Sequence, residues 1–314
     1  MIPKVKLGRT PLEVSRLCLG AMYFGSKDSD GESLKRLDQY AAAGGNFLDT
    51  ANMYAHWATN SSRGGESERL IGDWLRRRSN RSQMVVATKV GFPYPGVTYG
   101  TTAKQIKEEC DKSLLRLGTD YIDLYYAHTD DLQTPMEETL EAFNDLVRAG
   151  KVRYIGASNF SAWRLERAKQ ISERNGWASY CCIQQRFTYA RPKTGWDFGG
   201  QISANDDLLQ YVKDAGISLL AYSPLLGGSY TNSSKPFMEQ YQGPDTDARL
   251  KVLREIADET GATCNQLVYF WLMHAAASIP LVASSTDEQF AEALGTLRMT
   301  LSDEQVNRLS AAGI

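Results

Sequence analysis

The sequence of 314 residues is poor in side chains that bind metals or form disulfides, with only three histidines and five cysteines. The cysteines form no CxxC pair, and no cysteine and histidine pattern has the spacing of zinc ligands. Five is also an odd number, and each cysteine lies in an apolar periodic segment. We therefore expect no bound metal, and buried, reduced thiols at Cys18, Cys110, Cys181, Cys182 and Cys264.

An excess of one charge sign is also missing, because the formal net charge is only -2. This balance does not favour nucleic acid or an anionic membrane as a partner, so a small molecule is the better expectation. The first residues, MIPKVKLGRT, lack the apolar core of a secretory signal, and His274 and Pro280 interrupt the most apolar run, residues 267–283. We expect a cytoplasmic protein in which that run forms a buried helix and a strand.

Two nucleotide-binding motifs are absent as well. No glycine-rich dinucleotide fingerprint follows the first strand and no GxxxxGK loop occurs, which disfavours a doubly wound fold. The chain instead alternates helical segments with short runs of β-branched and aromatic residues, a pattern typical of repeated βα units. We predict a single (β/α)8 TIM barrel over residues 1–314, with strands near residues 17–19, 47–49, 84–89, 122–127, 152–156, 181–185, 217–221 and 280–283.

Three further segments refine this barrel. The stretch KLGRTPLEVSRLCLG pairs two extended pieces about a turn, which predicts an N-terminal β-hairpin closing one end of the barrel. Residues 102–118 predict a helix that is capped by Thr102. We expect two long loops, near residues 187–205 and 225–245, at the carboxyl-terminal face, where barrel enzymes carry their active sites.

Polar side chains end three consecutive predicted strands. Asp49 ends one strand with Tyr54 five residues later, Lys89 ends the next, and His128 follows the third. Each residue taken alone has a simple structural explanation: a turn cap, a packed phenol, a solvated lysine or a structural histidine. Because the carboxyl ends of barrel strands meet at one face, the four side chains together indicate a functional site.

These four groups suit proton transfer to a carbonyl oxygen. A phenol has a reference pKa of about 10, and we expect the Lys89 ammonium to lower the pKa of Tyr54 and make it a proton donor near neutral pH. Asp49 would keep Lys89 charged. His128, which is favoured in its neutral form beside this cation, would bind the substrate oxygen or pass protons.

The motifs resemble those of the aldo-keto reductase family, whose catalytic Asp, Tyr, Lys and His occur in this order. The matching segments cover nearly the whole chain and include LGRTPLEVSRLCLG, GGNFLDTANMY, GGESERLIGDWL, ATKVG, DYIDLYYAH, GKVRYIGASNF, IQQRF and LLAYSPLLGG. The resemblance implies an enzyme that interconverts a carbonyl (aldehyde, ketone or sugar) and an alcohol by hydride transfer. It assigns catalysis to Asp49, Tyr54, Lys89 and His128, with Tyr54 as the general acid and base.

The resemblance also implies cofactor contacts. Ser158, Asn159 and Gln184 would bind the nicotinamide carboxamide, Tyr222 would stack on its ring, and Ser223, Leu225 and Gly227 would lie along the pyrophosphate. At the adenosine end the match is weaker, since Ala293 stands where the family usually has Asn. Ser285, Gln289 and Glu292 there resemble the branch with the potassium-channel β subunits, which still bind NADP(H).

The family therefore favours NADP(H), with NAD(H) as the alternative. Lys235 and Arg249 are the two candidate partners of a 2′-phosphate, and for each of them solvated surface is the competing interpretation.

The loop after Tyr54 is longer than the family resemblance implies, so that Trp57 is expected to overhang the site. We predict an aromatic wall that stacks on a sugar or an aryl group, with ordinary loop anchoring as an equal alternative. Its candidate members are Trp57, Phe92, Tyr94, Tyr126 and Trp196.

Two other functions stay open at this point. One is a cofactor-binding regulatory subunit with little turnover, like the channel β subunits. The other is a hydrolase that pairs Asp49 with Glu66 or Glu68, for which no carboxylate separation is known from sequence. The expected partner in the leading interpretation is a small carbonyl or alcohol substrate, without nucleic acid or membrane, and nothing in the sequence indicates an oligomer.

Overall fold

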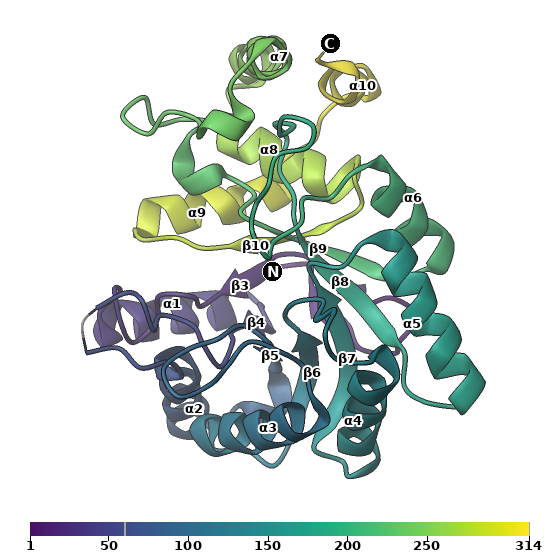
Figure 1. Cartoon of the computed structure of the whole chain (residues 1–314). Helices are drawn as coiled ribbons and strands as arrows, with labels where there is room; N and C mark the ends of the chain where they lie inside the picture. Colours follow the sequence, from purple (N-terminus) through teal and green to yellow (C-terminus); the bar gives the residue numbers. More distant parts are fainter. Residues whose placement is uncertain (60, 314) are drawn as a thin grey trace.

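A computed structural model of the chain describes residues 1–59 and 61–313. Its centre is a closed barrel of parallel strands (Figure 1), in the order β10, β3, β4, β5, β6, β7, β8, β9. The strands are β3 (Cys18–Gly20), β4 (Phe47–Asp49), β5 (Val85–Val90), β6 (Ile122–Ala127), β7 (Val152–Ser158), β8 (Tyr180–Arg186), β9 (Ser218–Tyr222) and β10 (Ile279–Val282). Each predicted strand overlaps one of these, so the prediction of a (β/α)8 barrel is confirmed.

Helices surround the barrel (Figure 1). They are α1 (Asp30–Ala42), α2 (Glu66–Arg78), α3 (Ala103–Leu117), α4 (Met136–Arg148), α5 (Ala162–Asn175), α6 (Asp206–Ala215), α7 (Pro244–Thr260), α8 (Cys264–His274), α9 (Asp287–Gly295) and α10 (Asp303–Ala311). The Thr102 side chain accepts a hydrogen bond from the Gln105 amide and begins α3, as predicted. Gly118 ends that helix in the left-handed region at φ 63°.

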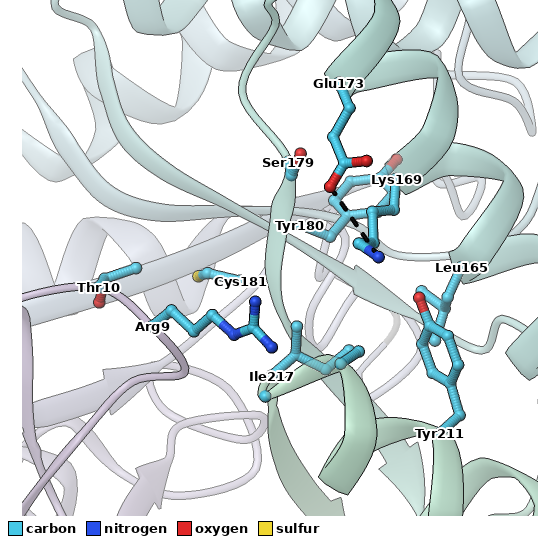
Figure 2. Close-up of a pocket in the computed structure, with 12 residues that line it drawn as sticks. Arg9, Thr10, Leu165, Lys169, Glu173, Ser179, Tyr180, Cys181, Tyr211 and Ile217 are labelled. Carbon is cyan, nitrogen blue, oxygen red and sulfur yellow. Dashed lines mark ion pairs between the residues drawn. The ribbon is translucent and has the colours of Figure 1, made fainter.

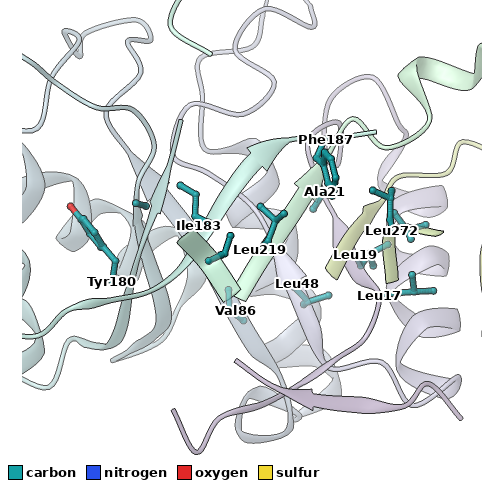
Figure 3. Close-up of a cluster of buried hydrophobic side chains, with 14 of the residues drawn as sticks. Leu17, Leu19, Ala21, Leu48, Val86, Tyr180, Ile183, Phe187, Leu219 and Leu272 are labelled. Atoms are coloured by element: carbon teal, nitrogen blue, oxygen red, sulfur yellow. The ribbon is translucent and has the colours of Figure 1, made fainter. Parts of the chain in front are cut away.

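The period of two along each strand separates two apolar layers. Leu48, Val86 and Ile183 belong to the layer between the strands and the helices, part of which Figure 3 shows. Phe47 and Leu124 alternate with them and belong to the cluster that fills the barrel. A polar residue one pleat beyond an interior apolar residue therefore also faces the inside of the barrel, at its carboxyl-terminal end.

The amino-terminal end of the barrel is closed by the predicted hairpin. Strands β1 (Lys4–Lys6) and β2 (Glu13–Ser15) pair antiparallel. Leu7 and Val14 are fully buried and pack against the interior cluster, so the hairpin acts as a plug.

Two expectations from composition concern the chain as a whole. The five cysteines are free, four of them buried and Cys264 half-buried. Across residues 1–59 and 61–313, no helix has both the length and the apolar character needed to cross a membrane.

Candidate active site

Strand alternation explains how four polar side chains reach one place. Asp49 follows Phe47 by two residues on β4, and Lys89 lies in the same way on β5, so both point into the barrel. His128 comes directly after β6. Tyr54 lies on the loop after β4, which folds back over the barrel. The structure thus brings together all four residues that the sequence singles out.

Lys89 is the centre of this cluster. Its Nζ donates hydrogen bonds to Asp49 Oδ1 at 2.6 Å, to the Thr50 carbonyl at 2.7 Å and to Tyr54 Oη at 2.8 Å. Lys89 and Asp49 are both fully buried. Burying the two charges costs free energy, which their attraction and the added hydrogen bonds offset only in such close geometry.

The direction of the Tyr54 pKa differs from the prediction. Burial, and then the negative charge of Asp49, raise the pKa of the Tyr54 phenol well above its usual value. The expected lowering by Lys89 is therefore wrong, because the sequence did not reveal how deeply the phenol is buried. Burial also lowers the pKa of Lys89, while Asp49 opposes that change. Tyr54 consequently holds its proton at neutral pH.

His128 borders the same space and is neutral, as expected. Burial and the nearby Lys89 charge lower its pKa well below the usual value. Its ring meets the Tyr54 ring edge-on at 5.9 Å between centroids, and the Phe92 ring at 4.7 Å. Nδ1 of His128 is buried and has no hydrogen-bond partner within the described part of the chain.

A second layer of polar groups lies at the ends of β7, β8 and β9. Gln184 Nε2 donates to Asp49 Oδ2 at 2.7 Å. Asn159 sits in the left-handed region at φ 62°, and its Nδ2 donates to the His128 carbonyl at 2.9 Å and to Ser158 Oγ at 3.1 Å. Tyr222 Oη donates to Asn159 Oδ1 at 2.8 Å. Amides and hydroxyls therefore line one side of the four-residue cluster.

Comparison with known proteins identifies the family of the chain. The sequence profile of the aldo/keto reductase family matches residues 16–314. The chain belongs to the aldo/keto reductase family. It is 30% identical to an uncharacterized oxidoreductase, YrpG, of Bacillus subtilis, over 97% of this chain and 94% of that protein.

Two fungal relatives extend this comparison. A versiconal hemiacetal acetate reductase of Aspergillus parasiticus is 29% identical, over 97% of this chain and 95% of its own length. A norsolorinic acid reductase B of the same species is 31% identical, over 96% of this chain and 81% of its own. Aldo/keto reductases use nicotinamide cofactors and interconvert carbonyls and alcohols, so this chain is an oxidoreductase.

The polar layer fits a nicotinamide carboxamide chemically, since Ser158, Asn159 and Gln184 offer buried hydroxyl and amide groups beside the four-residue cluster. The loop after β9 fits an anionic group. Ser223, Leu226, Gly227 and Gly228 all have positive φ, and a Cβ at either glycine would meet nothing within 4 Å. Backbone turns that combine right-handed and left-handed residues can form concave sites whose amides bind anions, and Leu225 at φ -104° precedes the left-handed run that begins at Leu226. This reductase therefore has residues suited to the carboxamide and to the phosphate of the nicotinamide mononucleotide half of a cofactor.

At the predicted adenosine end, Ser285 and Gln289 lie at the start of α9, where the Ser285 amide donates to Gln289 Oε1 at 2.9 Å. Glu292 accepts from Thr263 Oγ1 at 2.6 Å. Lys235 is exposed and donates to the Gly227 carbonyl at 3.1 Å, which keeps it beside the open loop.

Arg249 is not a surface residue, because its side chain is held in the interior by protein partners. It is 1% exposed, donates to the Tyr189 carbonyl at 3.1 Å and pairs with Asp245 at 3.2 Å. The solvated-surface interpretation of Arg249 is therefore wrong, while a contact with a 2′-phosphate stays a prediction for Arg249 and for Lys235.

The aromatic wall is only partly formed as predicted. Phe92 borders His128, while Trp57 and Trp196 are 46% and 36% exposed. Tyr94 instead directs its hydroxyl to Glu109 Oε2 at 2.6 Å, outside the four-residue cluster. Tyr126 is fully buried inside the barrel.

Tyr126 reaches that interior position because its neighbour on β7 is a glycine. A Cβ at Gly156 would lie 2.6 Å from the Tyr126 ring. The Lys89 ammonium lies 5.8 Å from the centre of that ring, so Tyr126 packs within the barrel instead of lining the wall.

The hydrolase interpretation is also wrong. Glu68 is fully buried outside the barrel, where it accepts from Thr88 at 2.6 Å and pairs with Arg116 at 2.5 Å. Glu66 accepts from the Arg63 amide at 2.6 Å at the start of α2. Neither acid faces Asp49. Within the described residues, no three His, Cys, Asp or Glu side chains are grouped to hold a metal ion.

One residue at the barrel mouth was missed from sequence. Arg186 ends β8, with its guanidinium 5.4 Å from the Tyr222 ring centre and 5.0 Å from that of Phe198. The rule that selected Lys89, a cation at a strand end, would have found it as well.

A separate hollow of about 260 Å³ lies between α5, α6 and the hairpin (Figure 2). Arg9, Lys169 and Tyr211 reach its edge, and Lys169 pairs with Glu173 at 3.9 Å. Its lining includes the amino-terminal residues of β8, Tyr180 and Cys181, so it lies at the opposite end of the barrel from the four-residue cluster.

Proposed function

We propose that this protein reduces a carbonyl to an alcohol, and catalyses the reverse reaction, with Tyr54 as the general acid and base. The observation that carries the proposal is the contact of 2.8 Å between Lys89 Nζ and Tyr54 Oη, in a buried site where Lys89 also binds Asp49. A bound nicotinamide cofactor supplies or accepts the hydride.

In the reducing direction, Tyr54 donates its proton to the carbonyl oxygen as negative charge develops there. The raised pKa keeps the phenol protonated until that moment. The Lys89 ammonium then stabilises the phenolate through a direct charge-assisted hydrogen bond. Asp49 compensates the lysine charge in the buried site. In the oxidising direction the phenolate accepts the proton of the alcohol.

His128 binds and orients the substrate oxygen in this proposal. Its neutral ring avoids repulsion with Lys89, and its free Nδ1 shows that the described residues leave hydrogen-bonding capacity at the ring. A neutral imidazole with one N–H donates a hydrogen bond to an oxygen and adds no positive charge.

Cofactor binding is assigned to Ser158, Asn159, Gln184 and Tyr222 for the nicotinamide, and to the loop from Ser223 through Leu225 to Gly227 for the phosphates. Ser285, Gln289 and Glu292 are assigned to the adenosine. We favour NADP(H) over NAD(H) on the family resemblance, with Lys235, an exposed cation beside the loop, as the candidate partner of the 2′-phosphate.

The substrate is proposed to be a small carbonyl or alcohol against Trp57, Phe92 and Trp196, and the cytoplasm is the proposed location.

The decisive experiment follows the nicotinamide absorbance with a panel of aldehydes, ketones and sugars, for wild type and Tyr54→Phe. We expect turnover with at least one carbonyl and a loss of about 100-fold or more in the variant, as for removal of a positioned acid. The variant should bind the cofactor as well as wild type does, measured by fluorescence titration. Equal turnover of the two proteins would refute the role of Tyr54. Tight cofactor binding without turnover across the panel would favour a regulatory subunit.

A further inference from the structure

A buried carboxylate outside the barrel connects two loops of the active site. Glu109 lies on α3 and is 1% exposed. Its Oε2 accepts from Asn52 Nδ2 at 2.7 Å and from Tyr94 Oη at 2.6 Å, and its Oε1 accepts from Lys112 Nζ at 2.8 Å. Three donors thus converge on one side chain that the proposed chemistry does not use.

The donors come from the segments that surround the proposed acid. Asn52 lies between Asp49 and Tyr54, and Tyr94 lies on the loop after β5. The Tyr94 ring also covers Gly64, near the end of the loop that carries Tyr54. A Cβ at Gly64 would lie 2.6 Å from that ring and 3.1 Å from the Asn52 carbonyl. Glu109 therefore connects both ends of this long loop to α3.

A packing role alone does not account for a carboxylate at this position. An ionised carboxylate is costly to bury, and an apolar side chain would fill the same volume without that cost. The ammonium of Lys112 is half exposed, so it offsets only part of the penalty. What a carboxylate adds is direction, because each oxygen accepts from donors at defined positions.

The loop needs such an anchor. Asn52 is fully buried, and its backbone N–H donates to the Lys89 carbonyl at 3.3 Å, so a shift of Asn52 is transmitted directly to β5. Ala55, the residue after Tyr54, has φ 68°, a left-handed conformation that is unfavourable for a residue with a Cβ. A strained residue holds its conformation only where its surroundings fix it.

We propose that Glu109 is a positioning residue for this reaction: by holding Asn52 and Tyr94, it fixes the described residues 50–59 and 61–65 of the loop and keeps Tyr54 in contact with Lys89. The proposal rests on the proposed function for its catalytic consequence. Its structural half, the fixing of the loop, is independent of turnover.

An isosteric exchange tests it. Asn52→Asp places two carboxylates against each other, whereas Asn52→Asp combined with Glu109→Gln restores one amide and one carboxylate in the same volume. Asn52→Ala, which adds no charge, serves if Asn52→Asp does not fold. As a matched control, Asn144→Ala removes another buried side-chain amide, which accepts from the Ala178 amide at 3.1 Å beyond the amino-terminal end of β8.

Two measurements are made on each variant: hydrogen–deuterium exchange of the ligand-free protein, and kcat, KM and cofactor Kd with the best substrate of the panel. We expect Asn52→Asp to accelerate exchange in peptides covering residues 50–65 and to lower kcat about tenfold or more, because misplacement of a reacting group by about 1 Å is already costly. Cofactor Kd should change by less than about threefold, as Asn52 touches no proposed cofactor residue. The double variant should recover both the exchange pattern and most of kcat.

Asn144→Ala should lower stability without changing either readout for the loop. A double variant that exchanges as fast and turns over as slowly as Asn52→Asp would overturn the proposal, as would wild-type exchange in Asn52→Ala. If wild type reduces no carbonyl at all, the proposed function fails, yet the exchange of the ligand-free variants still decides whether Glu109 holds the loop.

Discussion

Gln184 Nε2 lies 2.7 Å from Asp49 Oδ2, so β8 holds the acid that belongs to β4 on the far side of the barrel. Lys89 occupies the other oxygen of Asp49. Both oxygens of the carboxylate therefore have a donor, as a fully buried charge requires. The amide that we propose for the cofactor carboxamide thus also holds Asp49 in the proposed catalytic cluster.

Gln184→Leu removes this donor at similar volume. We expect a loss of about 1–3 kcal/mol in the free energy of unfolding, the usual cost of leaving a buried acceptor without its partner. Cofactor affinity should fall together with kcat, because one amide contributes to both. Urea denaturation and fluorescence titration check the two effects. A variant with weaker cofactor binding and unchanged stability would contradict the structural role of the bond.

Lys89→Met keeps a long side chain but leaves Asp49 without its counter-ion. Breaking a buried pair in this way costs about 3–5 kcal/mol. Turnover should fall by about 100-fold or more, since the phenolate formed at Tyr54 loses its cation. Adding Asp49→Asn should restore much of the stability but none of the turnover. Recovery of kcat in that double variant would show that Lys89 acts only as a structural partner of Asp49.

His128 makes stability depend on pH in a defined direction. The pKa of His128 is depressed in the folded protein, so below the unfolded value of about 6.5 the unfolded chain binds more protons than the folded one. The free energy of unfolding therefore decreases as the pH is lowered. The slope from this residue reaches at most about 1.4 kcal/mol per pH unit. Urea denaturation between about pH 7 and pH 5 should show a shallower decline in His128→Asn. His274→Asn should remove less of the decline, because that ring is exposed. Identical slopes for wild type and His128→Asn would contradict the depressed pKa.

In this proposal, the preference for NADPH over NADH depends on one exposed cation, Lys235. NADPH should bind more tightly than NADH, and Lys235→Ala should weaken NADPH by about fivefold while leaving NADH unchanged, as for one surface charge contact. High salt should reduce the difference. Fluorescence titrations with both cofactors measure it. Tighter binding of NADH to wild type would reverse the preference proposed here.

Trp57 is expected to act on substrate binding and not on chemistry. Trp57→Ala should raise KM for a bulky aryl carbonyl by about fivefold or more with kcat nearly unchanged, which is the signature of lost uniform binding. Trp177→Ala, a half-buried tryptophan just before β8, is the matched control and should leave KM unaltered. An unchanged KM in Trp57→Ala would support simple loop anchoring.

Strand periodicity explains why the strands and two of the inward-facing site residues could be predicted from the sequence. Polar residues one pleat beyond apolar ones locate Asp49 and Lys89 inside the barrel, and the chain pattern locates the strands themselves. The depth at which each side chain is buried could not be predicted from the sequence. Burial reverses the direction expected for the Tyr54 pKa, and it removes Tyr126 from the mouth of the barrel.

Contacts between distant segments account for the remaining differences. Arg249 donates a hydrogen bond to the carbonyl of Tyr189, which lies 60 residues earlier in the sequence. Glu109 binds Asn52 across 57 residues. In the sequence each is one charged residue on an amphipathic helix, and only the packing of that helix shows which face it presents.

The hairpin plug has a consequence for access to the proposed site. Leu7 and Val14 are fully buried and cover the amino-terminal end of the barrel, so the proposed ligands would approach from the carboxyl-terminal face. In the proposed function the cofactor takes the deeper groups, such as Gln184 at 2% exposure, and the substrate lies against Trp57, which is 46% exposed. On that assignment we expect the cofactor to bind before the substrate and to leave after it.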